Sequence, residues 1–132
     1  SPDMRIILAA LVCCVAASPA SATGSIACTS PDEDSVSVEL TIGSLPVLAV
    51  VGAAITAGDE RWSTDAQGEA AVSAGQAFAE EDRLLIDFTD TNVERVVVEV
   101  RLFRAFEEDD AAMAGTLRIP GKGAWPLVCI GP

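Results

Sequence analysis

Histidine and tyrosine are absent from the 132-residue chain, and Lys122 is its only lysine. Without an imidazole, the chain cannot build a Ser-His-Asp or Cys-His nucleophile, and it has no histidine to act as a general base. The same absence excludes zinc, copper and iron sites that depend on imidazole ligands. Many common forms of nucleophilic and metal-dependent catalysis are therefore excluded.

Positive charge is also scarce. Eight Lys and Arg stand against twenty Asp and Glu, which gives a formal net charge of −12. Nucleic acids and anionic membrane surfaces are bound through basic patches, and this composition disfavours such patches. Hydrophobic residues make up 50% of the chain, which is too high a fraction for intrinsic disorder. Length and composition together favour one globular domain that does not bind nucleic acid.

Residues 4–22 have the pattern of a cleavable secretory signal peptide. Arg5 supplies the positive charge, residues 6–17 form an apolar run, and residues 20–22 read Ala-Ser-Ala, a small-x-small cleavage site. The run is shorter than the about 20 residues that cross a bilayer. We therefore expect residues 1–22 to be an extension and signal peptide, residues 23–132 to be a single domain, and the mature chain to have no membrane span.

Cleavage after Ala22 would leave only Cys28 and Cys129 of the four cysteines. An even number of cysteines in an exported chain favours a disulfide, and two free thiols are the alternative. A metal site is disfavoured, because two thiolates without histidine are too few soft ligands. We predict a Cys28–Cys129 disulfide. A closed loop of roughly 100 residues would stabilise the fold by up to about 4.7 kcal/mol in the chain-entropy model.

Alternation of apolar and polar residues predicts an all-β fold. The pattern is clearest in residues 35–42 and 95–106, where every second side chain is Val, Leu or Ile over most of each range. A strand over 47–56 is expected either to be buried on both faces or to carry a bulge near Gly52. Further strands are expected over 61–63, 70–74, 84–89, 114–119 and 124–130. The strand over 70–74 has the weakest alternation, and a helix over 69–79 is the alternative there. Phe78 is expected in a loop.

Short strands with turn residues between them are typical of an antiparallel β-sandwich. We expect seven to eight strands in a Greek-key arrangement, with the strands of Cys28 and Cys129 adjacent. In the last strand, Trp125, Leu127 and Cys129 share one face, which places this cysteine inward.

One acidic connection could supply ligands for a cation. Asp90, Asn92 and Glu94 recur at every second position, and Asp87 ends the preceding strand. Calcium takes about six to eight oxygen ligands, so carboxylates and an amide in one loop are suitable material. The alternative is a hairpin turn in which Asp90 and Asn92 bond their own backbone. An EF-hand is excluded, because its glycine and its bidentate glutamate are missing.

Carboxylates also carry out catalysis in aspartic proteases and in glycosidases. An aspartic protease needs Asp-Thr-Gly, but Asp90-Thr91 is followed by Asn92. The glycine is needed for the turn that brings two carboxylates together. A two-carboxylate hydrolase stays open as an alternative in so acidic a chain, although no motif singles out a pair. The runs 80–82 and 107–110 are expected to be solvated loops.

The sequence as a whole predicts an exported, non-catalytic protein, located in the periplasm or outside the cell. Its expected role is a protein-interaction or structural module of the cell envelope, with an unknown protein partner. A partner segment could add a strand at a free sheet edge. The Ala-rich composition, with Arg in place of Lys, favours a GC-rich bacterial source. No cofactor is expected, and calcium-dependent binding and two-carboxylate hydrolysis are the alternatives.

Overall fold

The structure is a computed structural model that describes residues 23–44 and 48–131. The signal peptide expected in residues 4–22 lies outside the described residues. The described part folds into strands joined by turns, with one 3-10 turn, η2. The elements are β1 Thr23–Thr29, β2 Val36–Ser44, β3 Leu48–Ala57, β4 Glu60–Ser63, η2 Gly68–Ala70, β5 Ser73–Ala79, β6 Arg83–Thr89, β7 Val96–Glu107, β8 Asp110–Ile119 and β9 Gly123–Ile130.

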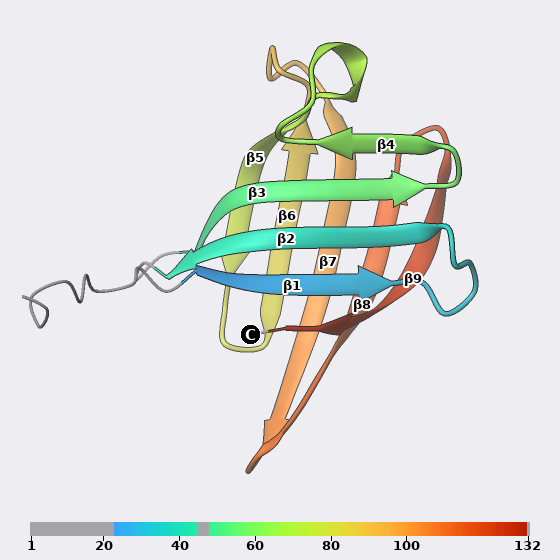
Figure 1. Ribbon diagram of the computed structural model, residues 1–132. Helices are drawn as coiled ribbons and strands as arrows, with labels where there is room; N and C mark the ends of the chain where they lie inside the picture. The colour runs from blue at the N-terminus through green and yellow to red at the C-terminus, as the bar shows by residue number, and fades with distance from the viewer. Residues whose placement is uncertain (1–22, 45–47, 132) are drawn as a thin grey trace, which may run out of the picture.

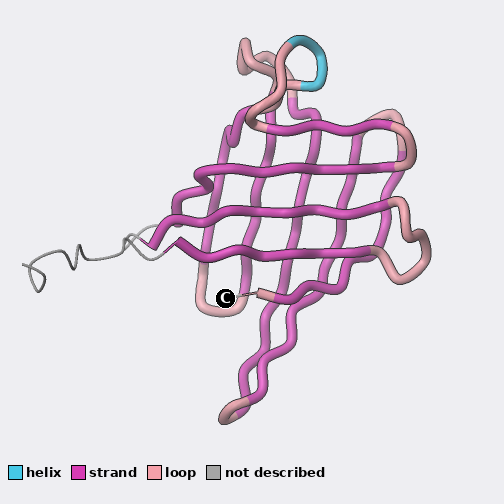
Figure 2. Tube along the Cα trace, viewed as in Figure 1, coloured by secondary structure: helices cyan, strands magenta, loops and turns pink. Residues whose placement is uncertain are grey.

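All nine strands belong to one sheet, in the order β4-β3-β2-β1-β9-β8-β7-β6-β5. Within β1 to β4 and within β5 to β9, each strand pairs with the next one in the sequence. β4 and β5 do not pair and form the two edges of the sheet, and β1 pairs with β9. The chain therefore consists of two meanders, β1 to β4 and β5 to β9, that join along the β1–β9 seam. Figures 1 and 2 show that β1 to β4 form one layer and that β6 to β8 cross behind it, so the sheet folds onto itself.

The prediction of an all-β, antiparallel fold is confirmed. The described residues form nine strands instead of the expected seven to eight, in one nearly closed sheet, so the two separate sheets of a sandwich are not shown and the Greek-key arrangement is wrong. Consecutive strands pair as hairpins throughout each meander, and the two layers are parts of a single nearly closed sheet. Alternation along a strand determines which side chains point inward, but it does not specify which strands pair. Connections of two residues, such as Gly58-Asp59 and Glu108-Asp109, are short enough that the two strands they join pair with each other as a hairpin.

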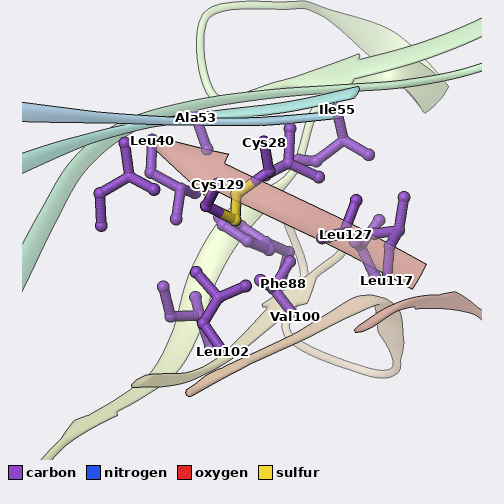
Figure 3. Packing of buried hydrophobic residues seen from close by; sticks show 14 of the residues in the cluster. Cys28, Leu40, Ala53, Ile55, Phe88, Val100, Leu102, Leu117, Leu127 and Cys129 are labelled. Carbon is purple, nitrogen blue, oxygen red and sulfur yellow. A yellow bond between two sulfur atoms is a disulfide. The ribbon is translucent and has the colours of Figure 1, made fainter. Parts of the chain in front are cut away.

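Alternate side chains from both layers fill the interior. Val38 and Leu40 of β2 share one buried cluster with Ile86 and Phe88 of β6, and these four side chains are at most 1% exposed. Figure 3 shows the Cys28–Cys129 disulfide among these side chains. The inward faces predicted for residues 35–42, 84–89 and 95–106 are thus confirmed over most of their length, as is the inward position of Leu127 and Cys129. Within the described residues, no helix is long and apolar enough to cross a membrane.

The segment around residues 68–79 differs from the prediction. The strand expected over 70–74 begins later, because residue 70 belongs to η2 and only residues 73 and 74 lie in β5. Phe78, expected in a loop, also lies in β5. β5 pairs with β6 through a register shift between Ala74 and Gln76. Gly75 occupies this bulge, and a Cβ there would come within 2.6 Å of the Thr89 methyl group. The pairing with β6 outweighs the weak local propensity of this alanine-rich segment.

The bulge expected near Gly52 is present. The register of β2 and β3 shifts between Thr41, which pairs with Gly52, and Ile42, which pairs with Val50. Val51 is the extra residue, and its side chain is 60% exposed. β3 is therefore covered on one face only, unlike the doubly buried strand that was the other interpretation of residues 47–56.

Candidate functional site

A cavity of about 1040 Å³ opens at the end of the sheet where β4 and η2 meet the β6–β7 connection. The turn between β8 and β9 completes its wall. Trp62 and Ile119 lie at its base, where they are 6% and 2% exposed. Trp62 points inward because it pairs with buried Ile55 across β3 and β4. Val97, half-buried on β7, extends this apolar base toward the opening.

Charged side chains surround the opening of this cavity. Three are acidic and three are basic: Glu60, Glu69, Asp90, Arg61, Arg95 and Lys122. Lys122 Nζ is paired with the Glu60 carboxylate and also lies 5.9 Å from the centre of the Trp62 ring. In the described part of the chain, neither Arg61 nor Arg95 has a carboxylate or a hydrogen-bond acceptor as partner. The cavity therefore combines an apolar base with two unpaired guanidinium groups.

The other described arginines are engaged. The side-chain hydrogen bond to Glu80 raises the pKa of Arg83 above its usual value. Arg118 Nη1 lies 2.6 Å from Glu99 Oε2. Arg104 Nη2 donates a hydrogen bond of 3.3 Å to the carbonyl oxygen of Glu80. Arg61 and Arg95, which are both exposed and line the cavity, are thus the described arginines without such a partner.

The structure does not bring the four predicted calcium ligands together. Asp87 is on the outer face of β6, where its Oδ1 lies 2.8 Å from Arg101 Nη2, a close ion pair without hydrogen-bond alignment. Asp90 Oδ1 accepts a hydrogen bond of 2.8 Å from the backbone N–H of Glu94. Asn92 and Glu94 are exposed. Asp90 therefore caps its own turn, as the alternative interpretation predicts.

Among the described residues, no group of three or more His, Cys, Asp or Glu side chains is arranged to hold a metal ion. Calcium binding by this loop stays a prediction, and it would require the loop to rearrange. The hydrolase alternative requires two buried acids in a pocket. The cavity carboxylates lie at its opening instead, where Glu60 and Glu69 are exposed and Asp90 is half-buried.

A second surface lies on the hairpin of β7 and β8. The β6 ladder ends at the pair Arg83–Phe103, and the β9 ladder reaches only to Met113. Residues 104–112 therefore form a two-stranded extension that projects beyond the body of the sheet (Figure 1). Its tip carries four consecutive acidic residues, 107–110, which confirms the prediction of an exposed acidic connection there.

Apolar side chains are exposed along this hairpin and the neighbouring β9. Phe103 and Val128 lie on one outward row, because both pair with Ala114, and they are 56% and 53% exposed. Ile130, two positions further along β9, is 81% exposed. Phe106, on the other side of the hairpin, shares a hollow of about 190 Å³ with Ile130. We call Phe103, Phe106, Val128 and Ile130 the hairpin patch.

Sequence reasoning did not identify either surface as a site. The cavity is built from three connections that lie far apart in the sequence, and alternation does not show that they meet. The hairpin patch did leave one signal, since alternation in residues 95–106 puts Phe103 on the face opposite Val98, Val100 and Leu102. The exposure of that face depends on where the β6 and β9 ladders end, and the sequence does not mark those points.

Comparisons of the chain with family models, with curated proteins and with solved structures find no match. The structure and its chemistry are therefore the basis of the functional argument.

Proposed function

We propose that this protein is an exported, non-catalytic interaction module of the cell envelope, and that the hairpin patch is its docking surface. The observation that carries the proposal is the exposure of Phe103, Phe106, Val128 and Ile130 on and beside a projecting hairpin. Exposed apolar side chains that gather in one region of a folded protein typically mark a site of association. Export is supported by the signal-peptide pattern of residues 4–22 and by the disulfide.

The charges beside the patch indicate the kind of partner. Residues 107–110 place four carboxylates next to Phe106, and the whole chain has a net charge of −12. A second copy would bring the same charges against one another, which disfavours self-association. The partner that fits is a protein with an apolar surface bordered by Lys and Arg. Such complementary charge would also accelerate the encounter.

The hairpin fits this role better than the free edges of the sheet. β4 has only four residues, and its Ser63 forms a bridge with Ala71, the residue after η2. β5 is interrupted by the bulge at Gly75. Short and bulged edge strands are typical means of preventing the addition of a further strand. The two edges therefore offer less to a partner than the hairpin patch does.

The test immobilises the mature protein and exposes it to an envelope extract of the producing bacterium. We expect a basic protein to be retained by the wild type and released by salt. Phe103→Ser and Ile130→Ser should each abolish retention. The matched control is Val51→Ser, since Val51 is 60% exposed on β3, outside the patch. Retention that survives both patch substitutions, or that Val51→Ser also removes, would contradict the proposal, as would the absence of any retained protein.

Sedimentation velocity distinguishes docking of a different protein from association of two copies of this chain. We expect a monomer at micromolar concentration in physiological salt. A dimer that Phe103→Ser dissociates would show that a second copy covers the patch, and the basic partner would then be wrong.

A further inference from the structure

The cavity beside β4 has features that the proposed docking function does not use. Figure 1 shows the cavity elements, η2 and the β6–β7 connection, at one end of the molecule and the projecting hairpin at the other. The cavity volume of about 1040 Å³ is at the upper end of the range for sites that bind small molecules. Its base is apolar, and its opening carries the two unpaired arginines, Arg61 and Arg95.

Unpaired arginines are informative in so acidic a protein. With twenty Asp and Glu against eight Lys and Arg, a basic side chain has many possible partners. Arg83, Arg101, Arg118 and Lys122 each have a carboxylate partner. The described arginines with neither a carboxylate nor a hydrogen-bond acceptor are Arg61 and Arg95, and both line this cavity.

We propose that the cavity binds a small organic anion with an apolar or aromatic body. Arg61 and Arg95 would hold the anionic group, because guanidinium presents N–H donors in a planar fork that matches an oxyanion. The body of the ligand would contact Trp62, Val97 and Ile119 at the base. Polar groups at the opening and an apolar base are the usual arrangement of a small-molecule site.

The lining carries as many acidic as basic side chains, three of each. The Glu60 carboxylate is already neutralised by Lys122. Asp90 Oδ1 accepts the Glu94 N–H and so belongs to its own turn. Glu69, exposed on η2, is the remaining lining carboxylate. The formal charge of the lining is therefore zero, and binding of an anion would depend on the hydrogen-bond donors of Arg61 and Arg95.

The test compares two probes of similar shape. 8-Anilinonaphthalene-1-sulfonate has an aromatic body and a sulfonate, and N-phenyl-1-naphthylamine has the body alone. The chain has no tyrosine, so Trp62 and Trp125 dominate its intrinsic emission. We expect the sulfonate probe to bind more tightly than the neutral probe and to quench tryptophan emission. Much of that quenching should be lost in Trp62→Phe.

Substitutions then assign the site. Arg61→Gln and Arg95→Gln should each weaken the sulfonate probe about tenfold, the loss expected for one charge-assisted hydrogen bond, and should leave the neutral probe unchanged. Arg118→Gln removes the same charge on the outer face of β8 and should have little effect. Phe103→Ser should also have little effect, which separates this site from the hairpin patch. Urea unfolding of each variant shows that the fold is retained.

Three results would overturn the proposal. One is equal affinity of the two probes. The second is equal loss in Arg118→Gln and in the two cavity variants, since that would reflect net charge alone. The third is the absence of saturable binding of the sulfonate probe. None of these bears on the docking proposal, which depends on other residues at the other end of the molecule.

Discussion

Cys28 and Cys129 face each other directly across β1 and β9, with their Cα atoms 4.0 Å apart and their sulfur atoms bonded at 2.01 Å. Only three residue pairs make up this ladder, and in the described residues it is the ladder that joins the two meanders. Close, directly opposed positions on antiparallel strands bring two Cβ atoms near each other. The disulfide thus covalently links β1 and β9, the two strands through which the two meanders join into one sheet.

Breaking this bond should destabilise the fold. The double variant Cys28→Ala/Cys129→Ala should lose about 3 to 5 kcal/mol of unfolding free energy, because the bond joins residues 101 apart in the sequence and both side chains are buried. Urea unfolding followed by tryptophan fluorescence measures the loss. The oxidised wild type under the same conditions is the reference. Reduction with dithiothreitol should lower the stability of the wild type but not that of the double variant. Equal stability before and after reduction of the wild type would contradict this role.

Gly115 allows the close approach of β8 to β7. A Cβ at this position would overlap the carbonyl group of Arg101. Gly115→Ala should therefore cost about 3 kcal/mol or more, because backbone must move to relieve the contact. Gly52→Ala is the matched control in β3, where the nearest atoms to a new Cβ are 3.7 Å away. The melting temperature of Gly115→Ala should be well below that of Gly52→Ala. Similar melting temperatures for the two variants would contradict the close approach of β8 to β7 at Gly115.

Val93 holds a left-handed backbone conformation, with φ of 58° in the β6–β7 connection. This conformation is unfavourable for a β-branched residue and is better tolerated by asparagine. Val93→Asn should stabilise the protein by about 1 kcal/mol, since the Val93 side chain is 68% exposed and contributes little packing. Val93→Ala should gain less. A lower melting temperature for Val93→Asn than for the wild type would contradict the interpretation.

Substitution of Asp90 distinguishes a structural turn from a calcium site in the β6–β7 connection. Loss of its hydrogen bond to the Glu94 N–H should make Asp90→Ala less stable by about 1 kcal/mol with or without calcium. The measurement is the melting temperature of both proteins in chelator and in millimolar calcium. If calcium raises the melting temperature of the wild type and Asp90→Ala removes that rise, the loop binds calcium and our assignment of Asp90 as a turn residue alone is wrong.

The hairpin patch should contribute little to folding. Phe103 and Ile130 are 56% and 81% exposed, so Phe103→Ser and Ile130→Ser should each change the unfolding free energy by less than about 1 kcal/mol. Chemical denaturation measures this directly. Such tolerance is expected of residues that serve association, and it allows their effect on binding to be interpreted. A loss of several kcal/mol would assign the patch to the fold instead.

The sequence alone predicted the local features of this fold but not its connectivity. The inward faces of β2, β6 and β7 follow from alternation, because a strand that covers a core on one side repeats every two residues. The disulfide pair follows from counting cysteines after the expected cleavage. Pairing order depends on long-range contacts, and β5 became a strand through its pairing with β6. The cavity forms where connections far apart in the sequence meet, and the hairpin patch is exposed because the β6 and β9 ladders end before it. The alternation of apolar and polar residues predicts neither feature.

The central functional claim is that the hairpin patch docks a protein partner, and site-specific photocrosslinking in the producing cells tests it most directly. A benzophenone amino acid would replace Phe103 in one protein and Val51 in another, two exposed apolar positions on different parts of the sheet. We predict one discrete adduct from position 103 and none from position 51. The absence of an adduct at position 103, or the same adducts from both positions, would contradict the claim.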